Sequence, residues 1–299
     1  MSPTSIVLLA LVALGCAAAA PAAAQLPPPS TPTARVGSPT LAVEDTMRVA
    51  LPEEIIRAPR VSLDEILKRV AEGEARRDSM MQDQVFTMLA ALTYLDDGKD
   101  ASQSVVRQWE SATRVYRKRP DKVRTVTLRQ KSNFKNDDGA NVTVGSSMAE
   151  ELVTFAFSPR TRSKFKFEIL ERHLVGNHVI YVIGFTPRSR LDDLPTGKAW
   201  IDTNEFVIVR QEFWYRDRSP APLFFESIES CIIERTQVDG RWWVLSRVLA
   251  RVKVTSLARF MARVGKQKLT PTIDLTLATR DWQVNRGIDD AIFDVKGKK

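Results

Sequence analysis

The chain has 299 residues, with 44 Lys or Arg against 36 Asp or Glu, and its formal net charge at pH 7 is +8. A chain of this length can bury one large core or two small ones. With Cys16 and Cys231 as its only cysteines, the chain cannot be a fold stapled by several disulfide bonds.

The first 24 residues have the pattern of an export signal. Ile6–Leu14 is apolar and too short to span a bilayer as a helix. Ala22–Ala24 fits the rule of small residues before a cleavage site, although no Lys or Arg precedes the apolar stretch. We therefore expect residues 1–24 to be a signal peptide. No later stretch has the length of a membrane-spanning helix.

A second interpretation of the same segment is a lipidation signal. Ala13–Cys16 (ALGC) resembles a lipobox, in which Cys16 would be lipidated and become the mature N-terminus. Cleavage after Ala24 predicts an exported protein of the periplasm, whereas lipidation of Cys16 predicts an outer-membrane lipoprotein. Residues 25–60 are rich in Pro, Ala and Thr and are expected to be a disordered tether. The folded domain is expected over residues 61–299.

A helix is predicted over residues 62–78. Ser62–Glu65 (SLDE) has the spacing of a capping box, in which the Ser62 hydroxyl accepts from the Glu65 N–H. Acidic residues come first and Arg76 and Arg77 come last, which the helix dipole favours. The apolar residues at helical spacing are Leu63, Ile66, Leu67 and Val70. Such an amphipathic helix needs an apolar surface to lie on.

Most of the remaining chain has the composition of strands joined by short turns. Val85–Leu95 is apolar throughout and fits a helix or a strand, but its Thr, Tyr and Val content favours a strand. Met148–Phe157 is a short helix or strand, and Leu257–Val264 a short helix. The other expected strands are Val105–Arg117, Lys122–Lys131, Phe165–Leu174, His178–Phe185, Phe224–Arg235, Arg241–Val254 and Thr272–Trp282.

The clearest hairpin is Gly197–Tyr215 (GKAWIDTNEFVIVRQEFWY). Ala199–Ile201 forms the incoming strand, residues 202–205 the turn, and Phe206–Tyr215 the outgoing strand. A second hairpin turns at Asp239-Gly240. Its outgoing strand alternates, with Trp242, Val244, Val248, Ala250, Val252 and Val254 facing one way and Arg247, Arg251 and Lys253 the other. The pattern predicts a mainly β (α+β) fold, a large antiparallel sheet with few helices that curls or closes to protect its edges.

Few residues in the chain carry chemistry. His173 and His178 flank a turn without a third metal ligand or a positioned nucleophile, so we interpret them as cross-strand turn residues. Cys231 is expected to be a buried, inert thiol. The sequence has no phosphate loop, nucleophile elbow or H-E-x-x-H motif. We therefore predict a protein that is not an enzyme and needs no metal or cofactor. A hydrolase that uses carboxylates is a distant alternative.

Aromatic residues gather on adjacent predicted strands. They are Trp200, Phe206, Phe213, Trp214, Tyr215, Phe224, Phe225, Trp242 and Trp243. A sheet core explains such a cluster. A more specific interpretation is an apolar groove that holds acyl chains, because adjacent pairs such as Trp242–Trp243 place aromatics on both faces of the sheet.

Several motifs together resemble a known family. They are SLDEIL (Ser62–Leu67), VYRKRPDKVR (Val115–Arg124), YVIGFTPR (Tyr181–Arg188), GKAWIDTNEFVIVRQEF (Gly197–Phe213) and NRGIDDAIF (Asn285–Phe293). Over residues 62–299 the chain resembles the outer-membrane lipoprotein-sorting proteins, which include the periplasmic lipoprotein carrier and its outer-membrane receptor. The resemblance implies a strongly curved antiparallel sheet, an incomplete barrel, with one or a few helices on its concave side. It also implies an apolar cavity that holds acyl chains of lipids or lipoproteins without chemistry.

Two functions remain open at this point. In the first, a non-enzymatic cell-envelope protein binds acyl chains in an apolar cavity. Leu63, Ile66, Leu67 and Val70 would cover this cavity, and Trp200, Phe206, Trp214 and Trp242 would line it. In the second, an interaction or scaffold protein places its basic sheet face (Arg247, Arg251 and Lys253) on an anionic membrane surface or a partner protein. Nucleic acid is not expected as a partner, because an exported basic protein meets mainly anionic lipids and glycans.

Overall fold

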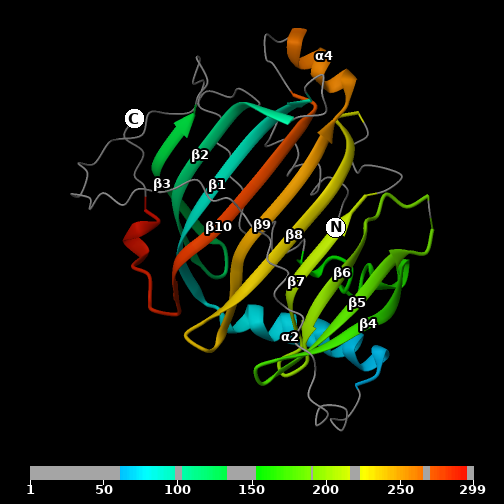
Figure 1. Cartoon of the computed structure of the whole chain (residues 1–299). Helices are drawn as coiled ribbons and strands as arrows, with labels where there is room; N and C mark the ends of the chain where they lie inside the picture. Colours follow the sequence, from blue (N-terminus) through cyan, green and yellow to red (C-terminus); the bar gives the residue numbers. More distant parts are fainter. Residues whose placement is uncertain are drawn as a thin grey trace.

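The computed structural model describes residues 61–97, 103–132, 153–189, 191–215, 223–264 and 270–294. The expected signal peptide, the alternative at Cys16 and the tether over residues 25–60 lie outside these ranges. Within them, ten strands form one antiparallel sheet, accompanied by two α-helices (Figure 1). No helix in the described ranges is long and apolar enough to cross a membrane.

The sheet is open at both edges. Its strands are β1 (Asp83–Asp97), β2 (Gln103–Lys118), β3 (Lys122–Ser132), β4 (Phe165–Val175), β5 (His178–Pro187), β6 (Thr196–Asp202), β7 (Val207–Trp214), β8 (Phe225–Val238), β9 (Trp242–Val254) and β10 (Thr272–Val284). Their order is β3-β2-β1-β10-β9-β8-β7-β6-β5-β4. β3 and β4 are the edges and do not pair, so the sheet is a half-barrel rather than a closed one. The predicted mainly β fold with an incomplete barrel is confirmed.

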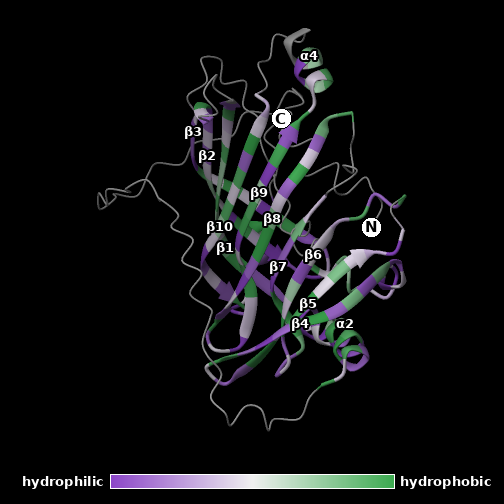
Figure 2. Ribbon diagram, turned by 45° about the vertical axis from the view of Figure 1, so that its right-hand side comes forward, coloured by the Kyte–Doolittle hydropathy of each residue, from purple (hydrophilic) through white to green (hydrophobic). Residues whose placement is uncertain are grey.

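The sheet bends because bulges interrupt its ladders. Register shifts occur between β1 and β10, β1 and β2, β2 and β3, β4 and β5, β6 and β7, and β8 and β9. An extra residue in one strand bends that strand and raises its local twist. Figure 2 shows hydrophobic and hydrophilic segments in alternation along the strands, which is typical of a sheet with one buried face.

One bulge corrects the alternation expected along β9. Arg247 pairs with Glu234 and Leu245 pairs with Arg235, so Ser246 is the extra residue. An extra residue exchanges the two faces of the strand for everything beyond it. Leu245 therefore joins Val248 and Ala250 in the main core. Trp242 and Val244, which were expected on the same face as those two residues, belong to a separate cluster.

Two turns show how local sequence shapes the hairpins. Asp239 and Gly240 have φ angles of 53° and 62°, as the predicted two-residue turn between β8 and β9 requires. Phe206 also has a positive φ, 56°, and lies in the turn between β6 and β7. β7 therefore starts at Val207, one residue later than the sequence predicted.

The helix α2 (Leu63–Met80) lies across the concave side of the sheet and contacts β7 and β4 (Figure 1). The Ser62 Oγ accepts from the Glu65 N–H at 3.3 Å, so the predicted cap is confirmed. The helix ends two residues later than predicted. Gly73 permits its close approach to the sheet, because a Cβ there would lie 2.2 Å from the carbonyl oxygen of Phe206.

The main core fills the space between α2 and the concave face. Its buried residues come from α2, from residues 153–157 and from every strand except β3. A second cluster lies under the predicted short helix, which is α4 (Ser256–Val264), and Ala258 of α4 belongs to it. In the part of Met148–Phe157 that is described, residues 153–154 are helical and 155–157 form a turn.

The last described residues lie against the β2–β3 hairpin. Lys118 Nζ and Lys122 Nζ lie 2.9 and 3.0 Å from Oδ1 of Asp290, in the 3-10 helix Asp290–Ile292. Hydrogen bonds from the two amines lower the pKa of Asp290. Another 3-10 helix, Arg162–Lys164, precedes β4.

The edge strand β3 is basic and largely exposed. Its sequence KVRTVTLRQKS has four cations and no acid. The side chains of Val123 and Leu128 are 56% and 59% exposed. Only β2 pairs with β3, so its outer backbone edge has no strand partner in the described part of the chain.

Candidate functional site

The sheet-facing side of α2 gathers most of the residues that the sequence singled out for a ligand site. These are Leu63, Ile66, Leu67 and Val70 of the helix and Phe206 of the facing turn. The guanidinium carbon of Arg69 lies 3.7 Å from the centroid of the Phe206 ring, which is therefore enclosed on both sides. These side chains pack directly on the sheet core. They anchor the helix, and only Val70 also borders the cavity described below.

The three tryptophans of the expected site lie elsewhere. Ala199 and Ile201 flank Trp200 and belong to the main core, as does Phe213 next to Trp214. Because neighbouring residues of a strand point to opposite faces, Trp200 and Trp214 lie on the convex face. Trp242 is buried in the separate cluster with Met81, Val244 and Val284. The structure therefore does not bring these tryptophans to the space beside α2.

Phenylalanines fill the concave side over β4, β5 and β7. The ring centroid of Phe155 lies 5.9, 5.7 and 5.5 Å from those of Phe165, Phe185 and Phe213, each in an edge-to-face arrangement. Such pairs contribute about 0.5–1.5 kcal/mol each beyond the burial of their area. This half of the concave face is therefore packed, and the open space lies on the other side of residues 153–157.

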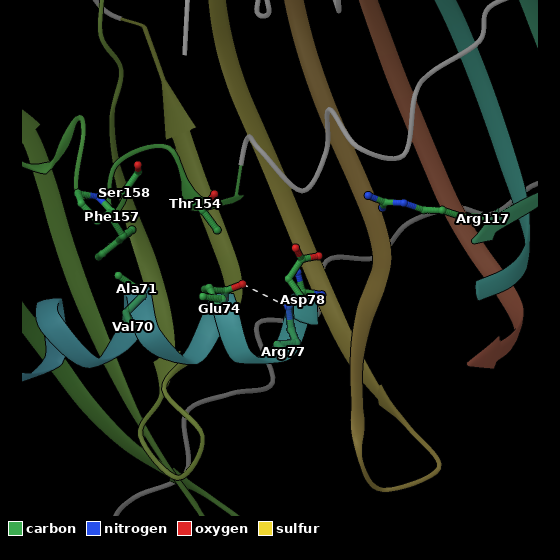
Figure 3. Close-up of a pocket in the computed structure, with 11 residues that line it drawn as sticks. Val70, Ala71, Glu74, Arg77, Asp78, Arg117, Thr154, Phe157 and Ser158 are labelled. Carbon is green, nitrogen blue, oxygen red and sulfur yellow. Dashed lines mark hydrogen bonds and ion pairs between the residues drawn. The ribbon is translucent and has the colours of Figure 1, made fainter. Parts of the chain in front are cut away.

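A cavity of about 390 Å³ lies beside α2 on this concave side (Figure 3). Its lining residues are Val70, Ala71, Glu74, Ala75, Arg77, Asp78, Arg117, Thr154, Phe157, Ser158 and Pro159. The helix forms one wall, residues 154–159 form a second, and β2 contributes Arg117 from across the space. The volume falls in the range of about 300–1,000 Å³ that is common for small-molecule sites.

A buried charge cluster holds the cavity wall to the sheet. Glu74 Oε1 lies 2.6 Å from Arg235 Nη1 of β8 and accepts from the Ile208 N–H at 2.8 Å. Its Oε2 accepts from Arg77 Nε at 3.2 Å. Arg77 also donates to the Trp243 carbonyl at 3.1 Å. The side chains of Glu74, Arg77 and Arg235 are 9%, 7% and 1% exposed, so these bonds are shielded from water.

The described lining of the cavity has four charged residues, which are Glu74, Arg77, Asp78 and Arg117. Arg117 is the one that comes from a strand. It lies between Gln84 of β1 and Val123 of β3, and its side chain extends from β2 toward α2 in Figure 3. Asp78, the lining carboxylate on that side, is already paired with Arg119. Within the described ranges, the Arg117 guanidinium forms no ion pair and no side-chain hydrogen bond. The five N–H donors of this group are therefore without a partner in the described part of the chain.

The basic face expected on β9 is neutralised by acids on the adjacent strands. Arg251 donates twice to Asp274 of β10, each at 2.7 Å, and Arg247 donates to Glu234 of β8 at 2.8 Å. Lys253 lies 2.8 Å from Glu229. These charges tie β8, β9 and β10 together across the sheet surface and do not form a cationic patch.

His178 and Cys231 have structural surroundings. His178 Nδ1 lies 2.6 Å from the carboxylate of Asp202, which is fully buried and also accepts from the Asn204 N–H at 2.9 Å. This contact joins the β4–β5 hairpin to the β6–β7 turn. Cys231 is buried in the main core, and burial raises the pKa of its thiol to about 12. In the described part of the chain, no three His, Cys, Asp or Glu residues gather as a metal site would require.

Sequence reasoning missed Glu74, Arg117 and Arg235. One signal for Arg235 was present in the chain: it shares the alternation of Cys231 and Ile233 and so takes an inward position. A charged residue at such a position requires a buried partner. Arg117 had no comparable signal. It lines the cavity only because α2 and residues 154–159 border the same space, and the local sequence does not indicate this arrangement.

No protein-family model matches the chain, and no curated protein does either. Among solved structures, the chain is similar to an outer membrane lipoprotein-sorting protein domain from Vibrio parahaemolyticus, at 12% identity and a TM-score of 0.34, over 78% of this chain and 97% of that one. A DUF1329 family protein from Desulfovibrio piger matches at 11% identity and a TM-score of 0.33, over 77% and 97%.

A LolA superfamily protein from Nitrosomonas europaea matches at 10% identity and a TM-score of 0.29, over 78% of this chain and 98% of that one. The lipoprotein-sorting family that the sequence resembles thus occurs among the similar solved structures. Because the TM-scores lie below 0.5, these similarities carry no argument about the function of this chain.

Proposed function

We propose that this protein binds an acyl chain of a lipid or lipoprotein, without chemistry, in the cavity between α2 and the concave face of the half-barrel. The observation that carries the proposal is the cavity itself, which one helix closes on one side. We also propose that the protein acts in the cell envelope, after cleavage behind Ala24 or lipidation of Cys16.

The cavity offers an acyl chain an apolar wall. Val70, Ala71 and Phe157 lie along its α2 side and the facing segment (Figure 3). Each CH₂ group that leaves water contributes about 0.8 kcal/mol to binding. A chain that replaces water along this wall therefore gains several kcal/mol from a short segment alone.

The polar side chains of the cavity favour binding over catalysis. A hydroxyl nucleophile such as that of Thr154 or Ser158 needs an adjacent base. The described lining includes no His or Cys, and both of its carboxylates are bound to arginines. These carboxylates therefore serve to hold charges in place.

Binding can be tested with a fluorescent fatty acid such as cis-parinaric acid and with variants of the cavity wall. Ala71→Phe adds a ring to the cavity and is expected to lower affinity for the probe by about tenfold or more, since it removes the space that the chain occupies. Glu72→Phe is the control, because Glu72 is the exposed neighbour on the same helix and does not line the cavity.

The outcomes separate clearly. Saturable binding by the natural chain and by E72F, with weak binding by A71F, supports the proposal. Equal binding by A71F and the natural chain places the probe elsewhere and contradicts it. The scaffold alternative lacks a supporting observation, because Arg247, Arg251 and Lys253 are paired with acids.

A further inference from the structure

We infer that the ligand of the α2 cavity carries an anionic head group, a carboxylate or a phosphate, and that the Arg117 guanidinium binds it. This inference rests on the proposed function and specifies its ligand class. The observation behind it is a cationic side chain that reaches into a partly apolar cavity without a partner among the described residues.

The other charges at the cavity are already committed. The Glu74 carboxylate receives hydrogen bonds from Arg77, Arg235 and the Ile208 backbone. The Asp78 carboxylate is paired with Arg119. Neither carboxylate is therefore available to neutralise Arg117.

The described residues of the cavity and its immediate surroundings include more cationic than anionic side chains. Among the described residues there, four guanidiniums, those of Arg77, Arg117, Arg119 and Arg235, stand beside two carboxylates. Two of these cations, Arg77 of the lining and Arg235 behind it, are bound to Glu74, and both have nearly inaccessible side chains. Because charges are screened less in a buried setting, this excess favours an anion in the cavity.

The geometry of guanidinium suits a carboxylate or a phosphate. Its planar set of N–H donors can form two parallel hydrogen bonds to two oxygens of such a group. Arg117 lies across the cavity from the apolar α2 side chains, so a head group at Arg117 leaves the acyl chain directed toward Val70 and Ala71. A neutral or cationic amphiphile lacks the anionic head group that would bind Arg117.

The first test compares head groups on one chain length with the natural protein. Calorimetry with dodecanoate, dodecanoyl lysophosphatidic acid, dodecyl maltoside and dodecyltrimethylammonium, each below its micelle concentration, gives the four affinities. The two anions are expected to bind about 10- to 100-fold more tightly than the neutral and cationic amphiphiles. Acetate and inorganic phosphate, which lack the chain, show whether the head group alone suffices. Dodecanoate against the lysophospholipid distinguishes a free fatty acid from a phospholipid source.

The second test uses Arg117→Gln, with Arg114→Gln as the matched control. Arg114 is on the same strand but faces the other side, where it donates to the Thr87 hydroxyl. R117Q is expected to lose the preference for anions and R114Q to keep it. Arg117→Lys should restore part of the affinity, because it retains the charge but not the paired donors.

Three results would overturn the inference. One is equal affinity of the natural chain for dodecanoate and dodecyl maltoside, which leaves the proposed acyl-chain binding intact. Another is unchanged affinity of a folded R117Q for dodecanoate. The third is no binding of any amphiphile, which refutes both the inference and the proposed function.

Discussion

Glu74→Gln (E74Q) tests whether the buried charge cluster holds α2 on the sheet. The natural carboxylate accepts from Arg235 at 2.6 Å, from the Ile208 N–H at 2.8 Å and from Arg77 at 3.2 Å. A glutamine of the same size keeps one oxygen for Arg235 and Ile208, but its NH₂ group then faces the Arg77 Nε–H. The variant loses the neutralising charge and one hydrogen bond at once.

The expected cost follows from the burial of the three side chains, none of which is more than 9% exposed. Removal of one partner from a buried ion pair costs about 3–5 kcal/mol, because a buried charge is left without compensation. For a domain of this size, each kcal/mol lowers the melting temperature by about 2–4 °C. We therefore expect E74Q to melt at least about 6 °C below the natural protein.

The assay is thermal and urea unfolding, followed by hydrogen exchange of the α2 amides. Glu65→Gln is the control on the same helix: Glu65 pairs with Arg69 at 3.2 Å, but the two side chains are 49% and 47% exposed. An exposed pair of this kind contributes under about 1 kcal/mol. If E74Q melted within about 2 °C of the natural protein, or no lower than E65Q, the cluster would not be what holds the helix.

The structure predicts the outcomes of three further experiments. Gly73→Ala forces α2 away from the Phe206 carbonyl and should destabilise the fold by about 1–3 kcal/mol in urea unfolding; an unchanged midpoint would contradict the close approach. The Cys231 thiol, with its pKa raised to about 12, should stay unlabelled by iodoacetamide at pH 8 in the folded protein and be labelled in urea, and rapid labelling without urea would show that it is accessible. The pKa of Asp290 is lowered, so the contact of its carboxylate with Lys118 and Lys122 stabilises the fold above the unfolded pKa of about 3.9 and is lost as the pH falls through the lower folded value. Protection of amides near residue 290, measured relative to the intrinsic exchange rate at each pH, should therefore fall at low pH, and Asp290→Asn should abolish that dependence.

Local sequence was enough to predict the elements whose physics is local. The Ser62 cap depends on residues within one helical turn, and the turn at Asp239-Gly240 depends on two residues that tolerate positive φ. Val85–Leu95 was assigned to a strand from its composition, and β1 confirms it. The pairing of β1 with β10 depends on the whole sheet, and no local pattern specifies it.

The candidate site was harder to predict, because the face of the sheet on which a side chain lies depends on the strand register. Trp200 and Trp214 were expected to line the cavity because aromatic residues gather on adjacent strands, but strict alternation places them on the convex face. The bulge at Ser246 separated Trp242 from Val248, which no count along the strand reveals in advance. Arg117 lines the cavity together with segments that are far apart from it in the chain, so no local pattern could predict its position there.

The basic edge strand β3 limits how far the sheet can grow. If a second copy added its own β3 to this edge, Lys122, Arg124, Arg129 and Lys131 would lie near the same four cations of the other chain. Like charges on paired strands are destabilising, and Lys on an edge strand is a common device against self-association. The half-barrel can thus keep an open edge, and with it an accessible concave side, without templating its own polymerisation.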